Sequence, residues 1–416
     1  MITTINNKHN KLNVPNLRFP EFQGEWEKYK VSDLLDFYST NSLSWDKLEY
    51  GTDAIQNLHY GLIHVGLSTM IDLSKDKLPN ITNGNTPKNY ELCQEGDIAF
   101  ADASEDTNEV AKAVEFYKLK GKDVICGLHT IHGRDNLQKT VVGYKGYVFS
   151  STAFHHQIRR IAQGTKIYSI NSKNFSECYI GIPSKEEQKK IATLLRLIDE
   201  RIVTQNKIIE DLKKLKSAII DYVINSLNTD FAKFGSLYEM AGEGGTPTTS
   251  NACFYDNGKI PFIKIDDLKK KYLTENKDFI TELGLQKSSA WLVPTHSILF
   301  SNGATIGEIS ITTYPVCTKQ GILGIVPKQN IDVEYLYYFM SSSYFKKAVS
   351  RIVTEGTMKT AYLKDINNTL CPIPTKKEQQ EIAKIPSALN SKIDTEKSIL
   401  NLLITQKQHL LHQMFI

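Results

Sequence analysis

Ile182-Pro-Ser-Lys-Glu-Glu-Gln-Lys-Lys-Ile-Ala192 occurs a second time in this chain, as Ile373-Pro-Thr-Lys-Lys-Glu-Gln-Gln-Glu-Ile-Ala383. Seven of the eleven positions are identical. The two copies are 191 residues apart, which is far longer than the roughly 20–50 residues of a solenoid repeat. The repeat therefore predicts two similar halves, each a larger module that ends in the same signal.

Each copy of the repeat is predicted to begin a helix. Ser184 and Glu187, like Thr375 and Glu378, have the spacing of a capping box, in which a hydroxyl and a carboxylate satisfy free backbone N–H groups at the start of a helix. A proline precedes each cap. Pro386 lies inside the second predicted helix, where a missing N–H is expected to bend the helix or make it restart near Ser387.

Apolar residues follow each cap at alternating spacings of four and three, which is typical of a coiled-coil seam. Both seams carry a polar residue at the same two places, Gln205 and Glu396 at one and Lys216 and Lys407 at the other. The predicted seam positions are Ile191, Leu195, Ile198, Ile202, Ile209, Leu212, Leu389, Ile393, Leu400 and Leu403. Two separate amphipathic helices, each docked on its own domain, are the alternative.

The segments before each helix have short β-rich stretches, broken by Gly, Asn and Asp clusters, with helical stretches between them. This pattern predicts an α+β fold with many loops. The predicted organisation is a lead-in at 1–25, a first globular domain at 26–183, a helix at 184–226, a second domain at 227–374 and a second helix at 375–416.

Composition excludes several classes of protein. The 416 residues carry a net charge of +4, which is not the strongly basic footprint of a nucleic-acid binder, so bulk charge alone does not indicate DNA. No apolar run approaches the ~18 residues of a membrane helix. Six scattered cysteines and a polar N-terminus without an apolar core predict reduced thiols in a cytoplasmic protein.

The common catalytic and cofactor motifs are missing from the sequence. It contains no Walker A loop, dinucleotide fingerprint, HExxH or GxSxG motif. His129 and His132 lack a cysteine or acid at ligand spacing, and the acidic run Glu105, Asp106 and Glu109 is expected to be solvated or structural. The sequence thus predicts no catalytic residue, metal site or cofactor in this chain.

Several stretches resemble the specificity subunit of type I restriction-modification systems. Leu17-Arg-Phe-Pro-Glu-Phe-Gln-Gly-Glu-Trp26 is similar to the lead-in of that family, and Gly244-Gly-Thr-Pro247 is similar to the start of its target-recognition domain. Leu299–Gly307 and Thr318-Lys-Gln-Gly321 resemble its later blocks. Gly127-Leu-His-Thr130 in the first half is similar to a different recognition-domain subtype.

The resemblance implies a fold and a function. Two target-recognition domains would each be followed by a long helix, and the helices would pair as an antiparallel coiled coil with approximate two-fold symmetry. The chain would recognise a bipartite, asymmetric site in double-stranded DNA without doing chemistry. Its partners would be two adenine-methyltransferase subunits, which use S-adenosylmethionine, and two restriction subunits, which use ATP and Mg²⁺; no membrane would be involved.

Candidate base-contacting residues are polar or cationic side chains on predicted loops, because such groups bond to base edges. The candidates are Ser104, His129, His132, Arg134, Arg159 and Lys166 in the first domain, and Thr246, Lys264, Asn302, Thr305, Lys319, Gln320 and Lys359 in the second. Two other hypotheses stay open. One is a coiled-coil scaffold with two binding globules that do not bind DNA, and the other is an enzyme that uses His129 or Asp106.

Overall fold

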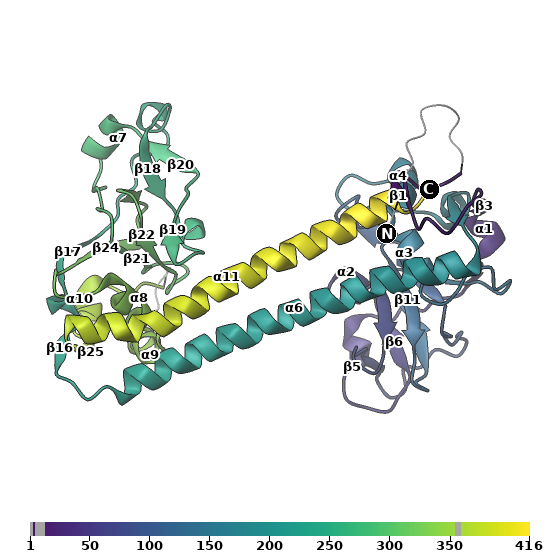
Figure 1. Ribbon diagram of the computed structural model, residues 1–416, viewed down its shortest axis with the longest axis horizontal. Coiled ribbons are helices and arrows are strands. Elements are labelled where there is room, and N and C mark those ends of the chain that lie inside the picture. Colours follow the sequence, from purple (N-terminus) through teal and green to yellow (C-terminus); the bar gives the residue numbers. More distant parts are fainter. Residues whose placement is uncertain (1–2, 5–12, 354–358) are drawn as a thin grey trace. The chain divides into compact units, whose positions relative to one another are not determined.

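The chain forms two compact units. The computed structural model describes residues 3–4, 13–353 and 359–416, so most of the first twelve residues of the predicted lead-in lie outside the described part. The first unit comprises Met1–Asn206 with Ile399–Ile416, and the second comprises Lys207–Ser398. Each unit contains one globular domain and parts of both long helices, α6 (Lys185–Ser226) and α11 (Lys376–Gln413) (Figure 1).

A five-stranded mixed sheet forms the centre of each globular domain. Its strands are β4 (Asp36–Tyr38), β7 (Met70–Asp72), β9 (Ile98–Ala101), β11 (Ala113–Lys118) and β13 (Thr130–Arg134) in the first unit, and β17 (Tyr238–Glu243), β19 (Tyr272–Leu273), β21 (Ile298–Ser301), β22 (Ile309–Thr312) and β24 (Ile322–Pro327) in the second. The strand orders are β4-β13-β9-β11-β7 and β17-β24-β21-β22-β19. In both sheets the last pair is parallel and the others are antiparallel. The predicted duplication is therefore present in the topology.

A smaller sheet lies beside each central sheet. Its strands are β5 (Leu48–Glu49), β6 (Gln56–Leu58), β8 (Asn80–Ile81) and β12 (Val124–Cys126) in the first unit, and β18 (Ile260–Ile263), β20 (Asp278–Ile280) and β23 (Cys317–Thr318) in the second. β6 runs parallel to β12 and antiparallel to β8, and β18 has the same relation to β23 and β20. The repeat therefore extends to the second layer of strands.

The remaining strands form two-stranded pairs. These are β1 (Thr3–Thr4) with β2 (Leu17–Arg18), β3 (Glu27–Lys30) with β15 (Tyr179–Ile182), β10 (Ala103–Ser104) with β14 (Tyr168–Ser169), and β16 (Phe231–Lys233) with β25 (Leu370–Pro372). β15 and β25 each lead directly into one copy of the repeated sequence. Both long helices thus start from an antiparallel strand pair.

Short helices complete each domain. They are α1 (Val31–Leu34), α2 (Tyr60–His64), α3 (Lys145–Phe149), α4 (Thr152–Ile161), α5 (Ser172–Ser176), α7 (Glu282–Gln286), α8 (Val333–Ser341), α9 (Ser343–Ile352) and α10 (Leu363–Ile366), with 3₁₀ turns at Trp45–Lys47, Phe234–Ser236, Ala252–Phe254 and Ile265–Asp267. Equivalent side chains hold the helices in both domains. Ser151 caps α4 and Ser342 caps α9, and the Tyr144 and Tyr335 hydroxyls donate to the carbonyls of Gly181 and Pro372.

The long helices pair antiparallel within each unit. In the first unit, Ile191 and Leu195 near the start of α6 pack in one core with Leu410 and Met414 at the end of α11. In the second unit, Lys216 late in α6 donates a 3.0 Å hydrogen bond to the Asn390 side chain early in α11. The predicted antiparallel pairing is confirmed, and the alternative of two unpaired helices is wrong.

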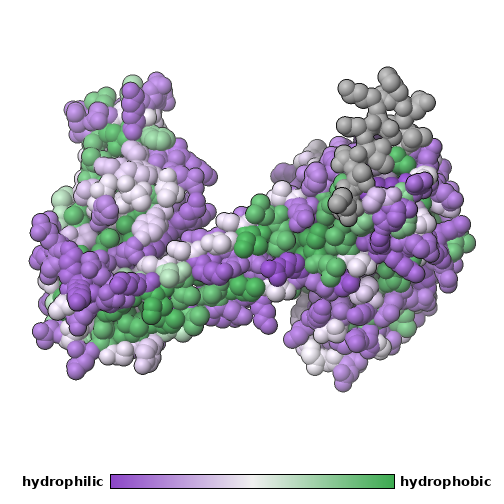
Figure 2. All heavy atoms as spheres, in the orientation of Figure 1, coloured by the Kyte–Doolittle hydropathy of each residue, from purple (hydrophilic) through white to green (hydrophobic). Residues whose placement is uncertain are grey.

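The predicted seam lies against protein along its whole length. None of the seam side chains is exposed: Ile191, Leu195, Ile198, Ile209 and Ile393 are buried, and Ile202, Leu212, Leu389, Leu400 and Leu403 are half-buried. Other apolar side chains of the same helices face outward, among them Val203, Tyr222 and Leu402, which are 62%, 75% and 70% exposed. Figure 2 shows hydrophobic surface along both helices.

The two caps of the long helices differ. The Thr375 hydroxyl accepts from the Glu378 N–H, and the Glu378 carboxylate accepts from the Thr375 N–H at 2.8 Å, which is the complete predicted capping box. Ser184 accepts from the Glu187 N–H, but the Glu187 carboxylate binds Arg18 through two 2.8 Å bonds. The second half of the predicted Ser184 box is therefore wrong, because the lead-in supplies a guanidinium that takes the carboxylate.

The glutamine of the repeated sequence fastens each long helix to its domain. Gln188 is fully buried, accepts from the Val141 N–H and donates to the Lys139 and Pro183 carbonyls. Gln379, 191 residues later, accepts from the Asp332 N–H and donates to the Asn330 and Pro374 carbonyls. The repeated sequence therefore marks an anchor as well as a helix start.

Pro386 does not interrupt α11. The helix runs from Lys376 to Gln413 with Pro386 inside it, so the restart expected near Ser387 is absent. The Ser387 hydroxyl instead bonds to the Glu334 carboxylate and accepts a 3.0 Å hydrogen bond from Lys271. These contacts hold the turn of α11 that contains the proline against its domain.

Candidate nucleic-acid interface

The loops of the first unit converge on one edge of its two sheets. β6 and β12 are parallel, so the residues that follow them, His59 and Gly127-Leu-His129, leave the small sheet together. Ala101 at the end of β9 pairs with Thr130 at the start of β13. We call the segments 59–64, 102–112 and 127–129 the first loop edge.

Aromatic and imidazole rings form a continuous chain at the first loop edge. The Trp45 ring lies 4.5 Å from the His59 ring, which lies 4.7 Å from Tyr60. Tyr60 contacts His129 at 5.2 Å and His64 at 5.9 Å between ring centroids. Burial, and then the charge of His129, lowers the pKa of His59, which favours its neutral form. Such rings offer both stacking faces and hydrogen-bonding groups to a nucleobase.

His129, one of the base-contacting candidates from the sequence, lies at this edge with an exposed and oriented side chain. Its side chain is 50% exposed, and its Nδ1 lies 3.1 Å from the Asp102 carboxylate. The backbone at His129 has a φ of +54°, a left-handed conformation that is uncommon for residues other than glycine. The turn and Asp102 together fix the direction of an exposed imidazole.

Ser104 belongs to the 102–112 segment, and Arg159 and Lys166 lie beside that segment. The Arg159 guanidinium donates to the Asn108 side chain at 3.0 Å, which attaches it to the 102–112 segment. Ser104 lies in β10, which pairs with β14, and exposed Lys166 lies two positions before the first residue of β14. The structure thus places Ser104 and His129 in the first loop edge, with Arg159 bonded to it and Lys166 close to a strand that pairs with it.

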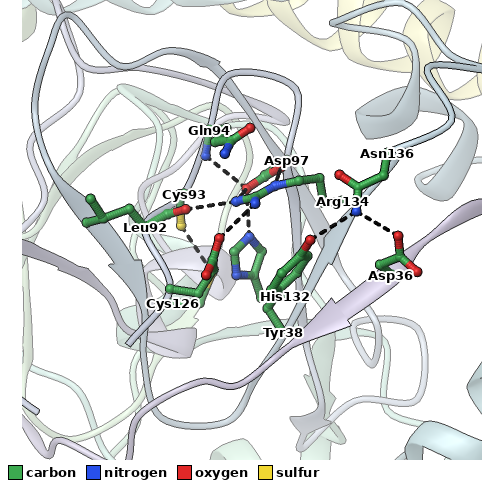
Figure 3. Close-up of polar contacts among 11 residues, drawn as sticks. Asp36, Tyr38, Leu92, Cys93, Gln94, Asp97, Cys126, His132, Arg134 and Asn136 are labelled. Carbon is green, nitrogen blue, oxygen red and sulfur yellow. Dashed lines mark hydrogen bonds and ion pairs between the residues drawn. The ribbon is translucent and has the colours of Figure 1, made fainter. Parts of the chain in front are cut away.

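His132 and Arg134 lie in the interior of the domain instead (Figure 3). His132 Nε2 lies 2.8 Å from the Asp97 carboxylate, and Arg134 donates to Asp97 at 2.8 and 2.9 Å, to the Glu91 carboxylate and to the Leu92 carbonyl. Burial opposes charge on Asp97, but the bonds from His132 and Arg134 hold its pKa below the usual range. The placement of these two residues therefore argues against the predicted base contacts.

The second unit has an equivalent edge. Lys264 follows β18, Lys319 and Gln320 follow β23, and Asn302 follows β21. The Lys319 N–H donates to the Ile263 carbonyl at 2.9 Å, and the Gln320 N–H donates to the Thr246 hydroxyl at 3.3 Å. We call residues 264, 302–305 and 319–321 the second loop edge.

The remaining predicted residues of the second domain differ in exposure. Thr305 and Lys359 are exposed, and Lys359 is next to Thr360, which bridges to Gly303. Asn302 is only 1% exposed, and its Nδ2 donates to the Ala361 carbonyl at 3.3 Å. Asn302 therefore ties the loop to a neighbouring segment, and its predicted base contact is not supported by its position.

Sequence analysis missed several side chains at the edges. His59 and Tyr60 belong to the first loop edge, and the Trp45 ring packs beside His59. Lys346 lines a groove with Lys359 and with Ala304 of the second loop edge. Position directly after a strand is the signal that could have identified His59 and Tyr60. Lys346 belongs to α9, about 40 positions after Ala304, so it gives no such signal.

The described residues contain no helix that is long and apolar enough to cross a membrane. Within the described part of the chain, one group of side chains could hold a metal ion: Cys93 and Cys126 lie beside buried His132. The groups at the two loop edges are hydrogen-bond donors, hydrogen-bond acceptors and rings, which suit binding of a polar, aromatic polymer such as DNA.

Comparison with known proteins gives consistent matches. The family profile described as "Type I restriction modification DNA specificity domain" matches residues 76–214 and 228–404. The MjaIX specificity subunit of Methanocaldococcus jannaschii is 25% identical over 62% of this chain and 64% of its own length, and the putative MjaX specificity subunit of the same organism is 24% identical over 93% and 94%. The crystal structure of the type I restriction-modification S subunit from M. genitalium has a TM-score of 0.55, with 17% identity over 97% of this chain and 99% of that one.

Proposed function

The chain belongs to the family of type I restriction-modification DNA specificity proteins, and on this premise we propose that it is the sequence-specific DNA-recognition subunit of such a complex. Each unit contributes one loop edge. Each edge recognises one half of a bipartite, asymmetric target in double-stranded DNA, and a nonspecific spacer separates the two halves.

One observation carries this proposal: the same five-stranded sheet, with three equivalent strands of a smaller sheet beside it, is built twice with different loop chemistry. The first loop edge presents rings, such as Tyr60 and His129. The second presents longer cationic and amide side chains, such as Lys319 and Gln320. A repeated scaffold with different contact groups is what recognition of two different half-sites requires.

The exposed edge residues have the chemistry for base contacts. Lysine bonds to guanine acceptors, and glutamine forms paired hydrogen bonds with adenine. Each good contact is worth about 1–3 kcal/mol of discrimination between bases. The net charge of only +4 is compatible with this role if partner subunits supply most of the phosphate contacts.

The long helices are the proposed docking elements for the partner subunits. Their seam residues are turned inward and are unavailable, whereas Leu215 and Tyr222 of α6 are 49% and 75% exposed. These two residues are seven positions apart and therefore share one helix face. Two adenine-methyltransferase subunits are the proposed occupants, and two restriction subunits can join them.

The chemistry of the complex is assigned to the partners. S-adenosylmethionine belongs to the methyltransferase subunits, and ATP with Mg²⁺ belongs to the restriction subunits. We expect this chain alone to transfer no methyl group, and we place it in the cytoplasm, where its DNA target lies. Methyl transfer to DNA by the purified chain without partners would contradict this assignment.

Mapping of modified adenines tests the proposal. Genomic DNA from the host with and without this gene would be sequenced for methylated adenine. The expected result is a two-part asymmetric motif that is modified only when the gene is present. An unchanged methylation pattern in a host that expresses the methyltransferase would instead favour a scaffold that does not bind DNA.

A further inference from the structure

Cys93, Cys126 and His132 meet in the interior of the first domain (Figure 3). Cys126 ends β12, His132 lies in β13, and Cys93 lies in the loop before β9. The two sulfurs are 3.6 Å apart, and the three ligand atoms all lie within 4.8 Å of one another. The three residues are 5%, 2% and 0% exposed. Three buried metal-ligating side chains therefore come within reach of one shared ion.

The sulfur separation fits a shared metal ion. Zinc binds thiolates at about 2.3 Å with tetrahedral angles, which places two ligand sulfurs about 3.8 Å apart. The observed 3.6 Å is close to that value. It is far longer than the roughly 2.05 Å of a disulfide, so both cysteines are free to act as ligands.

The hydrogen bonding of the His132 imidazole resembles that of a histidine that binds a metal ion. Its Nε2 lies 2.8 Å from the Asp97 carboxylate, while its Nδ1 is buried without a hydrogen-bond partner. An unpartnered buried nitrogen is rare and costly. Carboxylates regularly orient the histidine ligands of zinc through the second ring nitrogen. The buried Nδ1 is therefore available to coordinate an ion.

The charges around the site also balance. Asp97 is already neutralised by Arg134, whose guanidinium nitrogens lie 2.8 and 2.9 Å from its oxygens. The two thiols each lose a proton when they become ligands, so one divalent cation replaces two protons without changing the net charge of the interior. We propose that Cys93, Cys126 and His132 bind one Zn²⁺ ion.

The second unit provides an internal comparison. The Val293 N–H bonds to the Val316 carbonyl as the Cys93 N–H bonds to the Val124 carbonyl, so Val293 occupies the place of Cys93. Sheet register likewise puts Thr318 in the place of Cys126 and Gly324 in the place of His132. A Cβ added to Gly324 would lie 2.5 Å from a methyl group of Val293. These positions supply no comparable ligand set, so the expected stoichiometry is one Zn²⁺ per chain.

The site suggests a specific structural role. Cys126 and His132 flank the loop that carries exposed His129, and Cys93 ties this hairpin to the segment before β9. An ion bound by all three would stabilise the first loop edge against opening. This role rests on the proposed DNA-recognition function, whereas binding of the ion does not.

The full chain, stripped with a chelator and kept reduced, would be dialysed against Zn²⁺ and measured for bound metal. We expect one ion per chain, and loss of that ion in Cys93→Ala and Cys126→Ala. Cys317→Ala is the matched control, because Cys317 is a fully buried thiol in the equivalent strand β23. It should keep the ion.

Cobalt provides a second readout that needs no variant. Co²⁺ added to the unaltered chain should produce the intense near-ultraviolet absorption of cobalt–thiolate bonds, and Zn²⁺ should abolish it. Absence of this absorption, or binding far below one ion per chain, would overturn the proposal. Equal zinc binding by Cys93→Ala and the unaltered chain would do the same.

Discussion

The ammonium of Lys407 on α11 lies 2.6 Å from the Asp199 carboxylate on α6. Lys216, 191 positions before Lys407, lies on α6 and donates to Asn390 on α11. Asn390 is itself 191 positions after Asp199. The two units therefore use the same lysine position for different interactions. One lysine has a charged partner, and the other has only an amide.

Lys407→Met and Lys216→Met should consequently have opposite effects on stability. Lys407→Met leaves the Asp199 carboxylate, only 16% exposed, without its cation, and should cost about 1–3 kcal/mol. Lys216→Met removes a half-buried cation that has no acid at hydrogen-bond distance, so stability should stay equal or rise by up to about 1 kcal/mol. Denaturant unfolding measures the stability of each variant against the unaltered chain. Equal losses of stability in the two variants would contradict the prediction.

The gain in stability from Lys216→Met should shrink as the pH rises. Burial is the main cause that lowers the pKa of Lys216 below 10.5. Between the lowered pKa and 10.5 the folded state binds fewer protons than the unfolded state, so the stability of the unaltered chain rises with pH in that window. Unfolding of both proteins at pH 7 and at stepwise higher pH tests the sign. A stability advantage of Lys216→Met over the unaltered chain that grows with pH would contradict this prediction.

The sequence predicted the helices well and the polar contacts poorly, for a physical reason. Seam residues such as Ile191 repeat locally, so their period is visible without the fold. The partner of Glu187 is Arg18, 169 residues away, and His132 meets Asp97 only because β13 pairs with β9. Local spacing therefore could not show that His132 is buried or that Cys93 lies beside Cys126.

Arg18 should be far more important for stability than its place in a lead-in suggests. Its side chain is 6% exposed and that of Glu187 is 1% exposed, so Arg18→Ala leaves a buried charge unpaired and should cost about 3–5 kcal/mol. Lys190→Ala, which removes an exposed ion pair with Glu21, is the control and should cost no more than about 1 kcal/mol. Thermal unfolding compares them, and similar losses would count against a structural role for the lead-in.

Single substitutions at the loop edges should affect one half-site each. His129→Ala should relax base preference in the half-site of the first domain, and Gln320→Ala in that of the second, by about 1–3 kcal/mol per lost base contact. DNA binding by the assembled complex would be measured on targets altered in either half. Thr313→Ala, at an exposed residue outside the second loop edge, is the control. Loss of discrimination in both halves from one substitution would contradict separate recognition.

Exchange of a whole domain tests the central claim most directly. Residues 227–374 would be replaced by the equivalent segment of a relative with a different target, and the chimaera would be co-expressed with the methyltransferase partner. Modified adenines would then be mapped across the genome. The account predicts that one half-site changes to that of the donor while the other half-site stays the same. A change in both halves, or in neither, would contradict it.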